Sequence, residues 1–191
     1  WAAKCNFTMG PDGKMYSRML GGNLVRIDVE NARGENLTNG DLVGTKDGSA
    51  YGLVFDPQDE NVFYFSNNDK HCIYKYDLRT KECACWAGQE GKSGYLDGPI
   101  GQAMFNKPGQ MCVDSEGNII LTDTENHCIR KITMSTGYVS TLAGKPQNSG
   151  YVNGSAEDAQ FKKPLGICID NDDVMYIGDS ENRAIRRLAV E

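Results

Sequence analysis

One ten-residue segment gathers several side chains that enzymes use for proton transfer, covalent catalysis and metal binding. From Asp123 to Ile132 the chain reads Asp-Thr-Glu-Asn-His-Cys-Ile-Arg-Lys-Ile. Carboxylates beside an imidazole and a thiol can act as general acid and base, supply a nucleophile or ligate zinc. Taken alone, this segment is a candidate active site.

The segment is repeated, and the repetition changes its interpretation. Similar residues stand 56 positions later, from Asp179 to Leu188, and 56 positions earlier, from Asn67 to Tyr76. A long fixed period indicates a repeat protein, in which each unit packs on its neighbours because it cannot bury its own apolar face. Residues that recur in every unit serve the geometry of that unit first. We therefore expect no catalytic residue, metal or cofactor in this segment.

Five residues at repeat positions are interpreted as structural. His71 and His127 are the only histidines and occupy one repeat position. Asp123 and Asp179 end the second strand of their units, where Asn67 stands in an earlier unit. An Asp or Asn side chain at such a place bonds the backbone of the turn that follows. Paired catalytic carboxylates are the alternative, and repetition weighs against them.

Length and charge exclude several classes of protein. The 191 residues predict one domain, 1–191, with room for a sizeable core. The net charge of −6 provides no basic footprint for nucleic acid. The sequence has no apolar run of the length, about 18 residues, that inserts into a membrane. The chain begins with Trp1 rather than Met, so we expect that an upstream segment has been removed.

The seven cysteines are predicted to be buried apolar groups rather than a disulfide framework. Two pairs occupy repeat positions within apolar strand patterns, where a thiol acts as a small hydrophobe. Two more stand two apart on one predicted strand and share a face, which places them poorly for a mutual bond. The repeat pairs are Cys72 with Cys128 and Cys112 with Cys168, the strand pair is Cys83 with Cys85, and Cys5 is the remaining cysteine.

Each unit is predicted to contain four short strands. In the best-defined unit they cover 111–113, 119–121, 128–132 and 138–144. Short runs rich in β-branched and aromatic residues, separated by Gly, Asn and Asp, indicate an antiparallel four-stranded meander. The units span about 5–44, 51–88, 109–144 and 165–191, and the first is degenerate, with Leu42-Val43-Gly44 at the end of its fourth strand.

The third strand carries two adjacent basic residues, Arg130 and Lys131. Neighbouring units should cover both faces of an inner sheet. We therefore expect the basic stems to lie over apolar surface and the charged heads to reach the rim. An ion pair with the acidic connector before the strand would contribute only about 0–1 kcal/mol at the surface.

The repeated segment resembles an NHL repeat. The likeness rests on 123–132 and on the preceding segment 105–114, with three good copies from about 51 to 191 and a weak copy before them. It implies an all-β fold, a β-propeller of four-stranded antiparallel blades. NHL propellers usually have six blades, so about four units predict part of a six-bladed propeller. A closed four-bladed ring is the alternative.

The linker between units adds a second resemblance. Gly94-Tyr95-Leu96-Asp97-Gly98 matches residues 150–154 at the same 56-residue spacing. It is similar to a linker in envelope proteins of gut Bacteroidetes, in which an immunoglobulin-like TIG domain precedes the NHL propeller. The resemblance implies a cell-envelope location and missing upstream blades or a TIG-like domain.

Linkers and connectors on one side of the propeller form the candidate binding surface, here called the loop-bearing face. Its aromatic, carboxylate and amide side chains suit the recognition of sugars or peptides. The residues are Tyr95, Asp97, Tyr151, Asn153, Glu125 and Glu181. We predict a non-enzymatic binding or scaffold module for a protein, peptide or glycan.

Two other functions stay open. A metal-dependent lactonase or lyase would need Glu, Asn, Asp or His side chains that converge on the central channel. An RNA-binding NHL domain would need a basic patch, and the acidic charge of this chain opposes it.

Overall fold

Short apolar runs separated by polar turns produce four antiparallel sheets, the blades. The computed structural model describes residues 3–19, 23–38 and 51–189. Blade 1 contains β1 (Ala3–Met9), β2 (Met15–Met19), β3 (Leu24–Asp28) and β4 (Arg33–Asn36), and blade 2 contains β5 (Leu53–Phe55), β6 (Val62–Asn67), β7 (Cys72–Asp77) and β8 (Cys83–Ala87). Consecutive strands pair within each blade, as in a meander.

Blades 3 and 4 repeat this order with two variations. Blade 3 contains β10 (Pro108–Val113), β11 (Ile119–Asp123), β12 (Cys128–Thr133) and β13 (Tyr138–Ala143), and blade 4 contains β14 (Pro164–Ile169), β15 (Met175–Asp179) and β16 (Ala184–Leu188). The linker adds a fifth short strand to blade 3, β9 (Gly98–Pro99), which pairs with β13. Single 3-10 turns, η1 (Thr124–Asn126) and η2 (Ser180–Asn182), follow the second strands.

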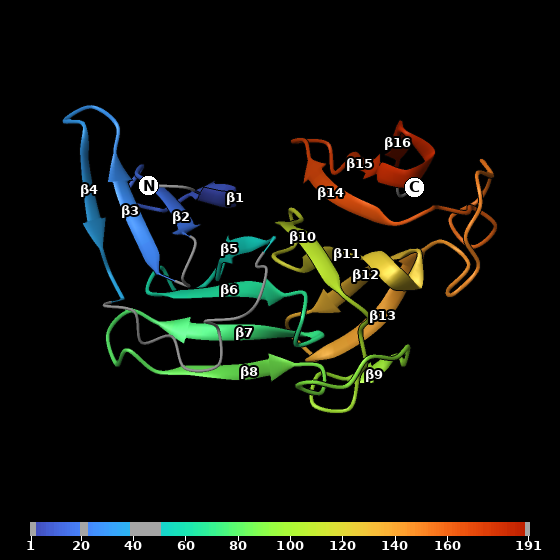
Figure 1. Cartoon of the computed structure of the whole chain (residues 1–191), viewed down its shortest axis with the longest axis horizontal. Helices are drawn as coiled ribbons and strands as arrows, with labels where there is room; N and C mark the ends of the chain where they lie inside the picture. Colours follow the sequence, from blue (N-terminus) through green and yellow to red (C-terminus); the bar gives the residue numbers. More distant parts are fainter. Residues whose placement is uncertain (1–2, 20–22, 39–50, 190–191) are drawn as a thin grey trace.

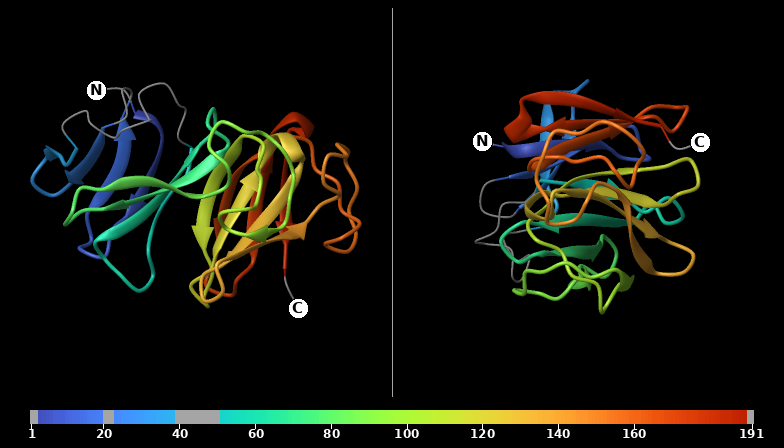
Figure 2. Two further views of the ribbon diagram at one scale, coloured as in Figure 1. Left: turned by 90° about the horizontal axis from the view of Figure 1, so that it is seen from below. Right: turned by 90° about the vertical axis from the view of Figure 1, so that its right-hand side faces the viewer.

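The predicted all-β propeller fold is confirmed (Figure 1). Figure 2 shows blades 1 and 2 at one end of the molecule and blades 3 and 4 at the other. The first strands of blades 3 and 4 begin earlier than predicted, because Pro108 and Pro164 already pair with the ends of the second strands. In the first unit the fourth strand is β4, and the predicted Leu42-Val43-Gly44 lies outside the described residues.

Apolar side chains between the blades form the core. One buried cluster joins blades 1 and 2, a second joins blades 2 and 3, and a third joins blades 3 and 4. Within the described ranges, none of the three clusters contains residues of both blade 1 and blade 4. Each blade is therefore stabilised mainly by its neighbours along the arc.

Each linker contributes a phenylalanine to a blade junction. Phe105 and Phe161 are almost fully buried, at 0% and 2% exposure. A glycine at the end of the preceding fourth strand makes room for each ring. A Cβ at Gly88 would lie 2.9 Å from Phe105, and one at Gly144 would lie 3.0 Å from Phe161. Both glycines also have positive φ, +93° and +97°, which disfavours any other residue.

Candidate functional site

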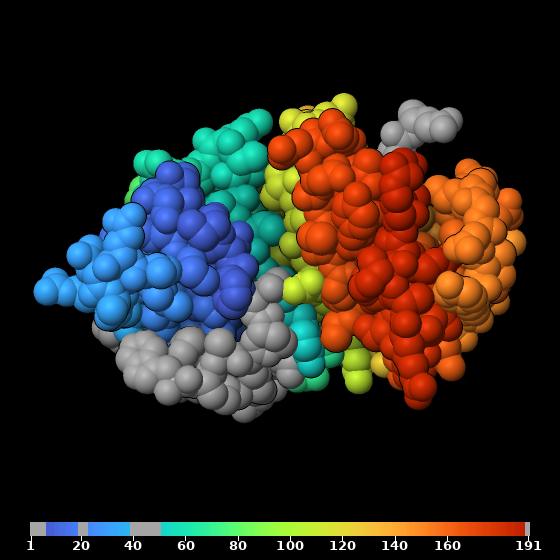
Figure 3. All heavy atoms as spheres, turned by 90° about the horizontal axis from the view of Figure 1, so that it is seen from above, coloured from blue at the N-terminus to red at the C-terminus, as the bar shows by residue number. Residues whose placement is uncertain are grey.

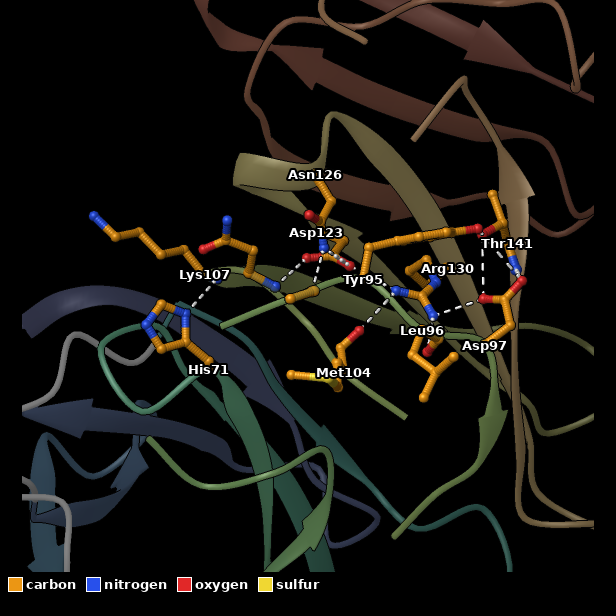
Figure 4. A network of polar contacts seen from close by, with 12 residues as sticks. His71, Tyr95, Leu96, Asp97, Met104, Lys107, Asp123, Asn126, Arg130 and Thr141 are labelled. Atoms are coloured by element: carbon orange, nitrogen blue, oxygen red, sulfur yellow. Dashed lines mark hydrogen bonds and ion pairs between the residues drawn. The ribbon is translucent and has the colours of Figure 1, made fainter. Parts of the chain in front are cut away.

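Arg130 is the centre of a buried polar network, here called the arginine clamp (Figure 4). Its guanidinium donates to Asp123 Oδ2 at 2.7 Å and to Asp97 Oδ1 at 2.6 Å. It also donates to the carbonyl oxygens of Leu96 and Met104, at 2.9 and 3.2 Å. Arg130 therefore fastens the linker, which carries Asp97, Leu96 and Met104, to the second and third strands of blade 3.

Two aromatic rings complete the clamp. The guanidinium carbon of Arg130 lies 4.8 Å from the centre of the Tyr95 ring and 5.2 Å from that of Phe105. The Tyr95 hydroxyl forms a 2.6 Å hydrogen bond with Thr141 Oγ1 on β13, and Thr141 N–H donates to Asp97 Oδ2. Linker, β12 and β13 are thereby held together.

The expectation that the Arg130 head reaches the rim is wrong. Its side chain and that of Asp123 are both 0% exposed, because the linker folds over β12 and shields it from water. Complete burial raises the pKa of Asp123 to about 6, while the Arg130 guanidinium and the Asn126 amide act in the opposite direction. Lys131, its neighbour, points to the other face and pairs with Asp114 at 2.9 Å while keeping 25% exposure.

The same clamp recurs in blade 4. Arg186 donates to Asp179 at 2.9 Å and to Asn153 Oδ1 at 2.7 Å, and lies 4.9 Å from the Tyr151 ring. In blade 2 the repeat positions of the arginine and the aspartate hold Tyr74 and Asn67, and both residues are buried. The clamp is thus a feature of the two blades that have the long linker.

The two histidines tie each linker to the preceding connector. His71 Nδ1 accepts a hydrogen bond from the Lys107 N–H at 3.1 Å, and His127 Nδ1 accepts one from the Lys163 N–H at 3.2 Å. Both histidines have left-handed backbones, with φ of 56° and 60°. Burial, followed by the nearby positive charge of Lys107, lowers the pKa of His71. The His71 contact requires a neutral ring, because only an unprotonated Nδ1 can accept.

The acidic connectors also contact the linkers. Glu125 N–H donates to the Asn106 carbonyl at 3.0 Å. The Lys163 ammonium lies 3.4 Å from Glu125 and 3.0 Å from Glu181, so it bridges the connectors of blades 3 and 4. Of the six predicted loop-face residues, the structure brings together Tyr95 with Asp97, Tyr151 with Asn153, and Glu125 with Glu181.

A cavity of about 920 Å³ lies between the first strands of all four blades. Its wall includes Val113 and Ile169 at the ends of β10 and β14 and the turns that follow β1 and β5, so it lies toward the first hairpins. The connectors stand at the opposite ends of the second strands. Most wall side chains are apolar, and Phe7 and Met9 are 64% and 60% exposed.

The first strands line this cavity at repeat positions such as Cys112 and Cys168, and sequence reasoning missed the non-repeated residues beside them. Gln58 and Glu60 also line the cavity and belong to the longer hairpin of the second unit. Phe7, another lining residue, belongs to the degenerate first unit. Differences between the repeat copies are the signal that could have found them. The cavity is the concave surface of the arc and offers both apolar and polar surface to a ligand.

The prediction that the repeat-position thiols are buried is confirmed for Cys72 and Cys128 and is wrong for Cys168. Cys72 and Cys128 are buried, Cys112 is half-buried and Cys168 is exposed, and six cysteines of the described chain are free thiols. Across residues 3–19, 23–38 and 51–189, no three His, Cys, Asp or Glu residues are grouped as a metal ion would require. The same residues contain no helix long and apolar enough to cross a membrane.

Comparison with known proteins identifies the repeat. The family model described as "NHL repeat" matches residues 105–132, which include Phe105 and Arg130. The NHL repeat-containing protein 2 of Gallus gallus is 30% identical over 152 residues, covering 78% of this chain and 19% of that protein.

Two solved structures from Bacteroides thetaiotaomicron are similar over nearly the whole chain. One, a structural genomics protein of unknown function, has a TM-score of 0.88 at 28% identity, covering 97% of this chain and 46% of that one. The other, an auxiliary nutrient binding protein, has a TM-score of 0.77 at 28% identity, covering 95% of this chain and 46% of that one. The chain thus spans about half of these solved chains and under a fifth of the curated relatives it matches.

Proposed function

Since this chain belongs to the NHL-repeat β-propellers, we propose that it is a non-enzymatic binding module whose ligand is a glycan. The sequence predicted the wider class of protein, peptide or glycan. Solved relatives that are named auxiliary nutrient binding proteins support a role in binding nutrients.

The cavity is the observation that carries the proposal. At about 920 Å³ it falls within the usual range of ligand sites, roughly 300–1,000 Å³. The exposed Phe7 ring can cover the C–H face of a sugar, while Gln58 and Glu60 at the rim can bond its hydroxyls. Phe55, also in the wall, is fixed by an edge-on contact with Tyr16 at 4.8 Å. A partly rigid apolar wall with polar groups at its edge suits a ligand that has both kinds of surface.

The loop-bearing face is a second proposed contact surface. Tyr95 and Asp97 are engaged by Arg130 and Thr141, which leaves them little freedom to bind. Tyr151 keeps 59% exposure, and Glu181 keeps 42% of its side chain exposed. We propose Tyr151, Glu181 and Glu125, the repeat partner of Glu181, for contact with a large ligand. Asn153 is held by Arg186 as Asp97 is held by Arg130.

The enzymatic and RNA-binding alternatives receive less support. The described part of the cavity wall contains no histidine, and its only carboxylates are Asp56 and Glu60. A metal-dependent lactonase or lyase needs several converging ligand atoms at that place. The charge of −6 opposes RNA, because phosphate contacts need basic side chains.

We also propose that the arc is part of a larger, six-bladed propeller in the cell envelope, with further blades or a TIG-like domain beyond this chain. The outer face of blade 4 supports this. Ile185 is 74% exposed and Tyr176 is 38% exposed, whereas their repeat partners in blade 3, Ile129 and Ile120, are fully buried against blade 4.

A glycan array probed with the labelled protein, followed by calorimetry on each positive glycan, tests the binding function. Phe7→Ala should weaken binding about tenfold or more, since it removes the exposed ring of the wall. Val29→Ala is the matched control, because Val29 is equally exposed at 64% but does not line the cavity. Absence of any glycan ligand, or equal affinities for the two variants, would show that the proposal is wrong.

A further inference from the structure

Blade 2 carries two thiols on one face of its third and fourth strands. These strands, β7 and β8, pair antiparallel, with Tyr74 opposite Cys85. Cys72 precedes Tyr74 by two residues, and residues two apart on a strand share a face. Cys72 and Cys85 therefore lie diagonally across the strand pair, on the face that packs against blade 1. Figure 3 shows blade 1, in blue, against the cyan atoms of blade 2.

Two contacts place the Cys85 thiol beside Cys72. The Cys85 thiol donates to the Gly88 carbonyl at 3.7 Å, so its side chain lies along β8 toward Gly88. Gly88 in turn lies directly against Cys72, because a Cβ at Gly88 would be 3.2 Å from the Cys72 Cα. A hydrogen bond between the two thiols raises the pKa of Cys72 and lowers that of Cys85. The two residues therefore form a preorganised dithiol.

Cys85 departs from the repeat. The residues 56 positions after Cys72 and Cys85 are Cys128 and Thr141, so blade 3 has one thiol where blade 2 has two. In blade 3, Thr141 is bound by the linker residues of the arginine clamp. Blade 2 has Tyr74 at the position of the clamp arginine. The second thiol thus stands in a blade whose third and fourth strands are not fastened by that arginine.

We propose that Cys72 and Cys85 are the site of a reversible disulfide that ties β7 to β8 by a covalent bond. Cys85 is half-buried and is the thiol that an external disulfide can reach, whereas Cys72 is 0% exposed. Cys85 attacks the external disulfide and breaks its S–S bond, which leaves a mixed disulfide on Cys85. Cys72 then attacks the Cys85 sulfur and displaces the second external sulfur. The two protein thiols pass their protons to the two leaving thiolates, so one external disulfide is reduced to two thiols.

The bond would stabilise the junction between blades 2 and 3 as well as blade 2 itself. Gly88, which lies between the two cysteines, donates its N–H to the Ile100 carbonyl of the linker at 2.8 Å. It also lies against the buried ring of Phe105. A cross-link across a short hairpin restricts the unfolded chain, so the oxidised form should be the more stable one. Neither cysteine lines the proposed glycan cavity, so this proposal is independent of glycan binding.

Peptide mapping of the full chain tests the pairing. The protein is equilibrated in buffers of oxidised and reduced glutathione, quenched with acid, alkylated and digested with trypsin. Mass spectrometry should then show peptide 71–75 linked to peptide 82–92, lighter than the two free peptides by two hydrogen atoms, and reduction should remove this species.

Peptide 82–92 also contains Cys83, so two matched variants assign the bond. Cys83→Ser should keep the linked peptide, and Cys85→Ser should abolish it. Serine suits position 85 because blade 3 has a hydroxyl residue, Thr141, at the corresponding place. A linked peptide that persists in Cys85→Ser would overturn the proposal. A Cys85 that carries glutathione at every buffer ratio, without a bond to Cys72, would overturn it too.

The melting temperature gives a second measurement. Oxidation should raise it by roughly 5–10 °C, because the bond closes a short loop in a domain of this size. The rise should persist in Cys83→Ser and disappear in Cys85→Ser. Equal melting temperatures for the oxidised and reduced forms of the unmodified sequence would contradict a bond that ties the two strands.

Discussion

Removal of the buried guanidinium in Arg130→Met should cost about 3–5 kcal/mol of the free energy of unfolding. Methionine replaces the apolar stem but none of the four hydrogen bonds that Arg130 donates to Asp123, Asp97 and the linker carbonyls. Asp123, at 0% exposure, would then lack its cation, and it would either stay buried as an uncompensated charge or take up a proton, at a cost in either case. Breaking one side of a buried ion pair has costs of this size.

Urea denaturation followed by circular dichroism measures this loss. For a domain of this size, it corresponds to a fall in melting temperature of roughly 6–20 °C. Lys131→Met is the matched control on the adjacent residue. Its ion pair with Asp114 is partly exposed, so the change should cost only about 0–1 kcal/mol.

A double variant separates the buried charge from the lost packing. Asp123→Asn in the Arg130→Met background removes the orphaned charge and keeps an oxygen that can accept from the Asn106 N–H. It should recover part of the stability. A loss below about 1 kcal/mol for Arg130→Met, or no recovery in the double variant, would refute the assignment of Arg130 as the residue that fastens the linker.

Three further predictions concern the blade junctions. The His71 pKa is lowered by burial, so its neutral ring stabilises the fold above the unfolded pKa of about 6.5, and this contribution is lost as the pH falls through the folded value. His71→Gln should therefore flatten the decline of melting temperature between pH 7 and pH 5. Gly88→Ala should destabilise by more than about 1 kcal/mol in urea denaturation, because its φ is +93° and a Cβ would lie 2.9 Å from Phe105. Mass spectrometry after brief alkylation should show Cys168, which is exposed, labelled well before Cys128, whose pKa burial raises; equal labelling would contradict the burial pattern.

The strands and their grouping into blades could be predicted from the sequence because both follow local rules. Short apolar runs such as Ile119–Leu121 define strands, and the 56-residue period aligns three copies of them. The structural interpretation of Asp123 and His127 also rested on this period. Asp123 contacts an arginine and His127 contacts a linker backbone, and each contact recurs at the equivalent position of a neighbouring blade.

The burial of Arg130 could not be predicted from its strand alone. It depends on a linker some 30 residues earlier that folds over β12, and the sequence pattern of β12 contains no sign of it. The signal was present elsewhere. Tyr95, Asp97 and Phe105 accompany Arg130 as Tyr151, Asn153 and Phe161 accompany Arg186, whereas the unit with Tyr74 lacks this long linker before it.

The composition of the cavity wall and the fifth strand of blade 3 could not be predicted from the sequence, for a different reason. The cavity wall combines short runs from the first strands and first hairpins of four blades, and only the folded arc brings these runs together. The strand β9 has only two residues, and its pairing with β13 depends on where the clamp places the linker. Positions that differ between repeats, such as Phe7 and Gln58, are the ones at which the sequence offers information on the ligand.

Calorimetric titration of the chain with each glycan that binds on the array, with and without EDTA, tests the central claim most directly. The ligand is recovered afterwards and its mass and anomeric structure are determined. The account predicts the same dissociation constant in both conditions, an intact ligand, and a constant raised about tenfold or more by Phe7→Ala but unchanged by Val29→Ala. Binding that EDTA abolishes, or a ligand recovered in cleaved form, would contradict a non-enzymatic binding module.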